Sequence, residues 1–196
     1  MINLRIYLEN VLRQILLRWT AKDIYAISFF VYSNECCEYK GYSNVTTFSV
    51  GYNTERGCNG ADQYAEERWN YAFWRQDATP IFCDDDDDEG MKLLFDWYAQ
   101  NGIENIGWED PDCYDEKMRY IGKGPVGYCE LLAEITAVAK KLQESGFIRE
   151  KFGAPIPIII HDLEYSWYVI EATKQANPHG EADVFLAAMK EMGCIE

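Results

Sequence analysis

The sequence has few positive charges, few histidines and no long apolar run. Its 196 residues include 18 Lys and Arg against 33 Asp and Glu, a formal net charge of −15, and a surface of that sign repels nucleic acid and anionic lipid. Only two histidines occur, at positions 161 and 179, so a multi-histidine metal centre is excluded. No CxxC pair indicates a zinc knuckle or a thioredoxin-like motif. We therefore expect no metal, no cofactor and no nucleic-acid partner.

A membrane-spanning segment is not expected either. The longest candidate, residues 2–19, is interrupted by charges at about helical intervals, whereas a spanning helix needs about 20 mostly apolar residues. The same stretch lacks the compact apolar region and cleavage site of a secretory signal. The seven cysteines show no metal-site spacing, which is typical of free thiols in a reducing compartment. These features favour a cytoplasmic protein that does not contact membranes.

Apolar and aromatic side chains are abundant. Hydrophobic residues make up 48% of the chain and include six Trp, fourteen Tyr and nine Phe, enough for a sizeable core. This composition excludes general disorder, which needs low hydrophobicity. A chain of this length fits one domain, so we expect a single domain over residues 1–196.

Hydrophobic periodicity predicts helices and strands in an irregular order. The expected helices cover residues 3–19, 61–75, 90–100, 125–146, 164–175 and 180–191, and the expected strands cover residues 25–32, 45–52 and 155–160. The last strand is wholly apolar, which favours a central position in the sheet. This order of elements is typical of an α+β fold, in which a mainly antiparallel sheet packs with helices.

The negative charge is concentrated in one segment. Residues 84–116 carry thirteen carboxylates against one cation, Lys92, and account for −12 of the net charge of −15. Residues 103–125 also lack periodicity, and a loop that long inside a compact domain is usually functional or partly disordered. We call residues 84–125 the acidic, loop-rich sector. Its field attracts cations or a basic protein.

The acidic sector supplies the residues that we expect to bind a partner. Consecutive aspartates point in diverging directions, so they cannot wrap one metal ion as a calcium loop does. Aromatic side chains among the charges are candidate anchors, because Trp and Tyr are enriched at interface hot spots. The expected partner-binding residues are Asp84, Asp85, Asp86, Asp87, Asp88, Glu89, Trp97, Tyr98, Trp108, Glu109, Asp110 and Asp112.

A glycine-rich segment at residues 122–127 matches the pattern GxGxxG. A dinucleotide-binding fingerprint needs a preceding strand, but the residues before this segment are charged. Pro125 also removes one backbone donor that a phosphate would use. We interpret the segment as a turn before a helix.

A second group of residues could form a small-molecule site. His161, Asp162 and Glu164 follow an apolar strand, and the carboxyl end of a strand is a common place for catalytic groups. Trp69, Asn70 and Trp74 could line a pocket from a neighbouring helix. The simpler interpretation is that His161 and Asp162 cap the next helix and that the aromatic residues pack in the core.

Four segments resemble a known family. They are Ile24-Tyr-Ala-Ile-Ser-Phe-Phe-Val31, Val50-Gly-Tyr-Asn-Thr-Glu55, Glu67-Arg-Trp-Asn-Tyr-Ala-Phe-Trp74 and Ile158-Ile-Ile-His-Asp-Leu-Glu164. In this order they resemble the DUF4303 family of bacterial proteins. The resemblance implies an immunity role beside a polymorphic toxin, and it supplies no catalytic residues that can be assigned to this sequence. The acidic run, Cys37 and Cys58 are not features of the family pattern.

Three hypotheses follow for the function. The first is an acidic, cytoplasmic binding protein of the immunity type that neutralises a basic toxin through the acidic sector. The alternative is a small-molecule enzyme with a site around His161, Asp162 and Glu164 and the helix that carries Trp69 and Trp74. The third is a scaffold protein, which predicts self-association that salt barely alters. The sequence does not determine the oligomeric state.

Overall fold

The part of the chain that the structure describes contains seven α-helices, one 3-10 helix and four strands. The computed structural model describes residues 3–83 and 89–195. The predicted contacts of Asp84–Asp88 therefore lie outside the described residues. The helices are α1 (Leu4–Arg18), α2 (Glu66–Trp69), α3 (Glu89–Gln100), α4 (Tyr128–Glu144), α5 (Phe147–Phe152), α6 (Trp167–Ala176), α7 (Asp183–Glu191) and the 3-10 helix η1 (Tyr71–Phe73). The strands are β1 (Ile24–Tyr32), β2 (Thr47–Thr54), β3 (Thr79–Phe82) and β4 (Ile158–His161).

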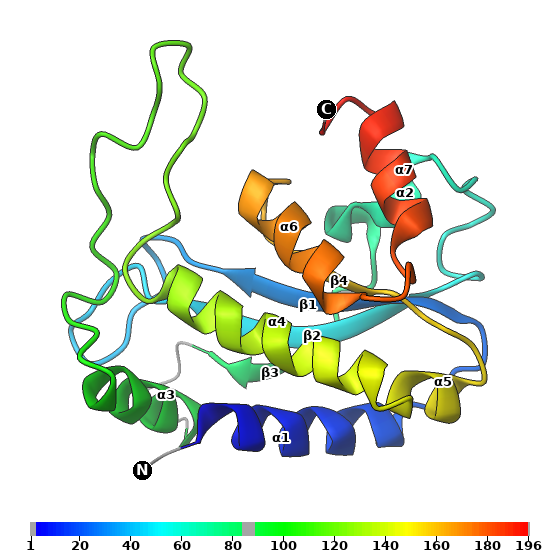
Figure 1. The fold of residues 1–196 in the computed structure, drawn as a ribbon, viewed down its shortest axis with the longest axis horizontal. Helices are drawn as coiled ribbons and strands as arrows, with labels where there is room; N and C mark the ends of the chain where they lie inside the picture. The colour runs from blue at the N-terminus through cyan, green and yellow to red at the C-terminus, as the bar shows by residue number, and fades with distance from the viewer. Residues whose placement is uncertain (1–2, 84–88, 196) are drawn as a thin grey trace.

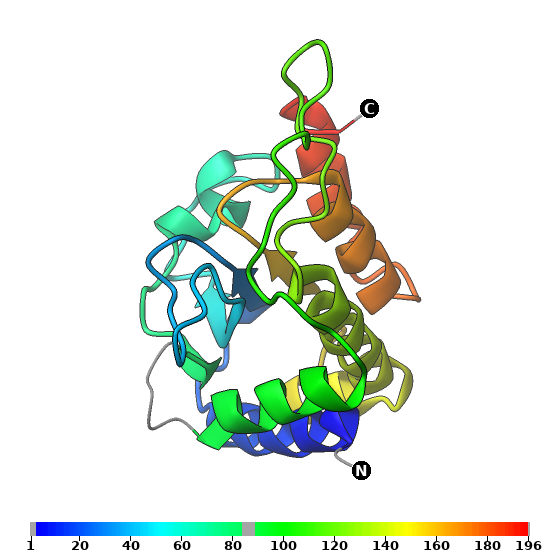
Figure 2. The same cartoon turned by 90° about the vertical axis from the view of Figure 1, so that its left-hand side faces the viewer.

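The strands form one open, mixed sheet in the order β3–β2–β1–β4. β2 pairs antiparallel with both β1 and β3, whereas β4 runs parallel to β1. Helices α1 and α4 lie on one side of the sheet, and α2, η1 and α7 lie on the other (Figure 1; Figure 2). The predicted α+β domain with a mainly antiparallel sheet is confirmed. No helix within the described ranges is long and apolar enough to cross a membrane.

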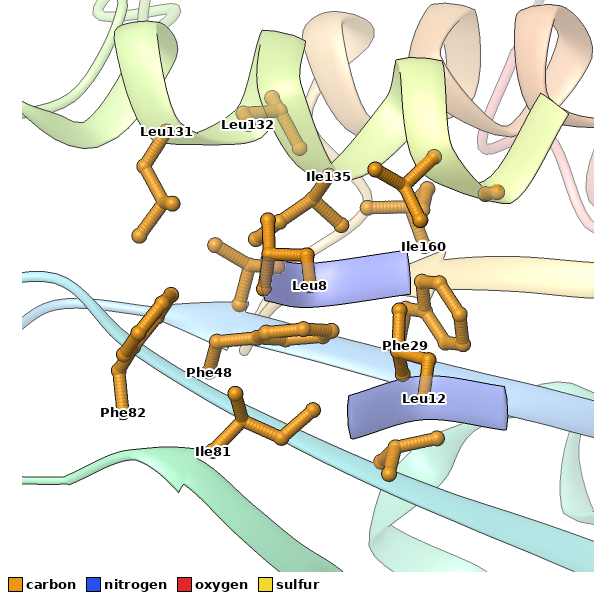
Figure 3. Close-up of a cluster of buried hydrophobic side chains, with 14 of the residues drawn as sticks. Leu8, Leu12, Phe29, Phe48, Ile81, Phe82, Leu131, Leu132, Ile135 and Ile160 are labelled. Atoms are coloured by element: carbon orange, nitrogen blue, oxygen red, sulfur yellow. The ribbon is translucent and has the colours of Figure 1, made fainter. Parts of the chain in front are cut away.

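The main core lies between the sheet and helices α1 and α4. Alternate residues of β1, including Phe29, point toward this core because successive side chains of a strand face opposite sides. Leu8 and Leu12 lie on one face of α1 because they are four residues apart, and both are fully buried. Figure 3 shows Leu8 beside Ile135 of α4 and Leu12 beside Phe29 of β1. The apolar periodicity of residues 3–19 thus correctly predicted α1.

The basic face of α1 is paired with carboxylates of the protein itself. Arg5 contacts Glu134 of α4 at 2.7 Å, and Glu9 of α1 accepts hydrogen bonds from Lys141 at 2.6 Å and Arg13 at 3.0 Å. The pairs Arg5–Glu134 and Lys141–Glu9 join α1 to α4.

β4 is an edge strand, so the predicted central position of residues 155–160 is wrong. One edge of β4 bonds to β1, and the other edge bonds to polar side chains of α6 and of the residue after it. Thr173 accepts from the amide of Ile160 at 3.0 Å. Asn177 accepts from the amide of Ile158 at 2.9 Å and donates to its carbonyl at 2.7 Å. These side chains satisfy a buried edge that usually needs another strand.

The predicted helix over residues 61–75 is shorter and broken. Only α2 and η1 form there, and Asn70 separates them with an extended backbone at φ −77° and ψ 120°. Its side chain accepts from the amide of Ala72 at 2.9 Å and thereby caps η1. Asparagine favours such local side-chain bonds over a continuous helix.

α4 begins at Tyr128 and not at Pro125. Gly127 precedes it with φ 97°, a conformation that glycine adopts without strain, and Glu130 accepts from the Gly127 amide at 3.1 Å. The GxGxxG segment is therefore a turn before a helix, as expected from its sequence context.

We expect Asn177→Ala to lower the free energy of unfolding by about 3 kcal/mol, because it leaves both backbone groups of Ile158 without partners in the core. Gln175→Ala, at an exposed position of α6, is the control and should change stability by less than about 0.5 kcal/mol. Urea denaturation measures both values. Equal losses in the two variants would show that the edge of β4 does not depend on Asn177.

Candidate functional site

His161 and Asp162 are neighbours in sequence but lie on opposite sides of the sheet. Their positions at the end of β4 explain this, because consecutive side chains of an extended segment alternate in direction. His161 joins the core beneath α2 and η1, whereas Asp162 faces the start of α4. The predicted group of His161, Asp162 and Glu164 is therefore divided between two places.

His161 is buried in a hydrogen-bonded cluster. Its Nε2 lies 2.9 Å from the carbonyl oxygen of Trp69, which can only accept, so Nε2 carries the proton. Nδ1 then accepts from the hydroxyl of Ser28 at 2.8 Å. Burial lowers the pKa of His161 to about 4, so the ring is neutral at pH 7. His161 is 1% exposed and Ser28 0%, which leaves no access for a substrate to this Ser–His pair.

The residues expected to line a pocket instead pack against the sheet. Trp69 and Trp74 are buried, and their indole N–H groups donate to the carbonyls of Gln63 and Arg68 at 2.7 and 2.9 Å. Asn70 caps η1, as described above. Trp69 and Trp74 pack the segment between β2 and β3 against the sheet, and the carbonyl of Trp69 links it to His161 of β4.

Asp162 and Glu164 line a cavity at the carboxyl ends of β1 and β4. We call it the Asp162 pocket; its volume is about 430 Å³. Because β1 and β4 are the parallel pair of the sheet, their carboxyl ends meet at one edge, a position at which ligands often bind in such sheets. The polar and aromatic residues that matter most for its chemistry are Glu109, Tyr120, Tyr128, Asp162, Glu164 and Tyr168.

Hydrogen bonds fix the side chains around the pocket. Tyr128 donates its hydroxyl to Asp162 at 2.6 Å, and the amide of Leu163 donates to the other carboxylate oxygen at 2.6 Å. Burial raises the pKa of Asp162 above its ordinary value. Tyr120 donates to Glu109 at 2.5 Å and accepts from the amide of Gly124 at 2.7 Å. The pocket is thus built from positioned carboxylates and phenols.

A long loop projects beside this pocket. Residues 103–127, which we call the projecting loop, leave the body of the protein between α3 and α4 (Figure 1). Its base is closed by paired backbone bonds between Gly107 or Trp108 and Val126, at 2.8–2.9 Å. Gly107 has φ 83° and lies so close to the carbonyl of Ser43 that an added Cβ would be 1.9 Å from its oxygen. Glycine is therefore required where the loop meets the body.

The projecting loop carries exposed charge and exposed apolar groups together. Six carboxylates and three cations lie between residues 104 and 123. Asp115 pairs with Arg119 at 2.7 Å, and no other ion pair involves these carboxylates within the described ranges. The exposed apolar side chains are Trp108 (58%), Tyr114 (53%), Met118 (76%) and Ile121 (57%). Such a combination is typical of a protein-binding surface.

The other predicted partner-binding residues differ in their exposure. Trp108, Glu109, Asp110 and Asp112 are exposed on the projecting loop, and Glu89 is exposed at the start of α3. Trp97 is half-buried. Tyr98 is 2% exposed and donates to the carbonyl of Gly127 at 3.0 Å, so it supports the base of the loop and cannot act as an anchor.

The tyrosines of the pocket were not identified from the sequence. Tyr128 lies in an apolar helical stripe and Tyr168 in another helix, so each is typical of a core residue on local evidence. The available signal was the pair of polar residues Ser33 and Asp162, each directly after a strand. That signal becomes informative only once β1 and β4 are known to run parallel.

In comparisons with protein-family models, curated proteins and solved structures, the chain matches none. Within the described ranges, no three His, Cys, Asp or Glu side chains are placed to hold a metal ion. The projecting loop and the Asp162 pocket are therefore the two features of the molecule that bear on its function.

We expect His161→Gln to flatten the pH dependence of stability. The folded-state pKa of about 4 lies below the ordinary value of 6.5, so only the unfolded chain binds this proton between those values. The wild-type protein should then lose on the order of 3 kcal/mol from this residue as pH falls from 6.5 to 4.

Urea denaturation at a series of pH values tests this expectation. The difference in unfolding free energy between wild type and His161→Gln should shrink across that pH range, while other titrating groups cancel because both proteins have them. Parallel curves would mean that His161 takes up its proton in the folded protein.

Proposed function

We propose that this chain is a cytoplasmic binding protein that neutralises a basic protein, in the manner of an immunity protein against a toxin. The observation that carries the proposal is the projecting loop, which exposes Trp108, Tyr114, Met118 and Ile121 and also carries exposed carboxylates. The resemblance to the DUF4303 family suggests the same role.

The mechanism is masking of positive charge. Carboxylates of the loop pair with Lys and Arg side chains that a toxin such as a nuclease uses to hold its substrate. The negative field speeds association by about 10–1,000-fold at low salt, and complementary charge selects the partner. Trp108 and Tyr114 supply the apolar contact that long-range charge does not provide, because buried aromatic anchors dominate interface energies.

The charge distribution of the whole molecule supports this assignment. Helix α3 and the projecting loop, which both carry carboxylates, lie on the left-hand side of the molecule in Figure 1. Elsewhere, some carboxylates pair with cations of the protein, as Glu9 does with Lys141 and Glu55 with Arg68. Of the six carboxylates between residues 104 and 123, only Asp115 forms an ion pair among the described residues.

A second candidate function is an enzyme that acts on a small polar molecule. The observation in its favour is that Asp162 and Glu164 share a cavity. His161, Trp69 and Trp74 lie on the other side of the sheet, so such an enzyme would depend on the two carboxylates and the pocket tyrosines. Activity lost in Asp162→Asn but retained in His161→Gln would support it.

Removal of three loop charges tests the proposed function. We expect Glu104→Gln, Asp112→Asn and Glu116→Gln together to lower the association rate with a basic partner roughly tenfold at low salt, with a smaller effect at high salt. The partner is first isolated from source cells on immobilised wild-type protein and then measured by surface plasmon resonance.

The matched control removes three exposed carboxylates from other elements, with Glu67→Gln, Glu150→Gln and Glu191→Gln. This triple variant has the same net charge as the loop variant. If the association rate falls by the same factor in both variants, net charge alone is responsible and the loop is not the binding surface. Recovery of no basic partner would count against the whole proposal.

A further inference from the structure

We infer that the Asp162 pocket receives an arginine side chain of the basic partner, an inference that rests on the proposed function. The pocket joins the projecting loop to the body, since Glu109, Tyr114 and Tyr120 of the loop line it together with Asp162 and Tyr168. A partner docked on the loop therefore has this cavity directly beside its contact surface.

The charged residues that line the pocket are all negative, which favours a cation as the ligand. Glu109, Asp162 and Glu164 line it, and the described residues around it include no Lys, Arg or His. Asp162 is half-buried and has no ion pair within the described ranges, although Tyr128 and the amide of Leu163 donate to it. Burial of a carboxylate disfavours its charged form, and a cation beside it offsets part of that cost.

The tyrosines of the pocket favour a guanidinium among cations. Four tyrosine rings form a row in which each ring meets the next edge-to-face, with neighbouring centroids 5.4–6.5 Å apart. The order is Tyr114, Tyr120, Tyr168 and Tyr128. A guanidinium is planar and weakly hydrated, so it stacks on aromatic rings and also bonds carboxylates in pairs. A lysine ammonium is a compact, strongly hydrated charge and gains less from both groups.

The protein already holds one of its own arginines by this chemistry. The guanidinium of Arg68 lies 4.0 Å from the ring centroid of Tyr25 and donates to both carboxylate oxygens of Glu55, at 2.5 and 2.9 Å. The Asp162 pocket presents the same two partners, phenol rings and carboxylates, to its cavity. An arginine from another protein supplies the missing cation.

The geometry distinguishes this ligand from a metal ion. The carboxylates of the pocket do not converge as a metal requires, in agreement with the lack of metal-binding groups among the described residues. A volume of about 430 Å³ instead suits a long side chain with a planar charged end. An anchor residue in such a cavity is typical of interface hot spots, which are enriched in arginine.

Two peptides test the inference by isothermal titration calorimetry. The probes are a blocked peptide of alternating Arg and Gly and the same peptide with Lys in place of Arg. We expect the arginine peptide to bind wild-type protein about tenfold more tightly. Asp162→Asn and Tyr168→Leu should each remove this preference and leave binding of the lysine peptide unchanged.

Glu164→Gln keeps the test valid if the first two variants fail to fold, because Glu164 is exposed. It should lower the affinity for the arginine peptide about threefold and have a smaller effect on the lysine peptide. The control is the loop variant with Glu104→Gln, Asp112→Asn and Glu116→Gln, which should weaken both peptides equally.

The outcomes separate this inference from the proposed function. If both peptides bind equally and only the loop variant weakens them, the pocket inference is overturned and the proposed function stands. If no carboxylate variant alters either peptide, both are overturned. If free Nα-acetylarginine amide binds as tightly as the arginine peptide, the pocket is a site for a small molecule and not for a partner's side chain.

Discussion

The outer edge of β4 is satisfied by Thr173 and Asn177, and the rest of the structure depends on these bonds. A four-residue strand at the edge of a sheet exposes backbone groups that must find partners once they are buried. Thr173 of α6 and Asn177 directly after it are four residues apart and face the same way, so they replace a neighbouring strand. Gln143 of α4 donates to Asn177 at 3.0 Å, which connects this edge to the helix that covers the main core. The sheet can therefore end at β4 without exposing an edge to another chain.

The parallel pairing of β4 with β1 builds the end of the sheet at which the Asp162 pocket lies. It brings Ser33 and Asp162 to one edge of the sheet, where the first turn of α4 and the projecting loop complete a cavity. It also directs the side chains of His161 and Asp162 to opposite faces of the sheet. In sequence the pair resembles a catalytic pair, but in the structure the two residues have different roles. His161 bonds to the carbonyl of Trp69 in the core, and Asp162 lines the pocket. Alternation along an extended segment is the physical reason.

Charged side chains differ in their pairing between the body of the protein and the projecting loop. On the body, arginines and lysines pair with nearby carboxylates, and Arg5 with Glu134 is an example that also joins two helices. On the projecting loop, Asp115 uses its carboxylate to close the tip with Arg119 and Glu109 accepts from Tyr120, while Glu104, Asp110, Asp112 and Glu116 are exposed. Exposed charge of this kind contributes little to stability, and its effect on association is much larger. The loop thus carries the property on which binding of a basic protein would depend.

Local patterns in the sequence were sufficient for α1, for the antiparallel strands β1 and β2, and for the position of the acidic sector. Periodicity, turn residues and charge are properties of short segments, so they can be read without knowing what packs against them. The edge position of β4 could not be read in this way, because a wholly apolar run indicates burial but not whether a strand or a helix provides its second partner. The meeting of Glu109, Tyr128, Asp162 and Tyr168 in one pocket was likewise decided by tertiary structure. Those residues come from four separate segments, and only the pairing of β4 with β1 and the course of the loop bring them within reach of one ligand.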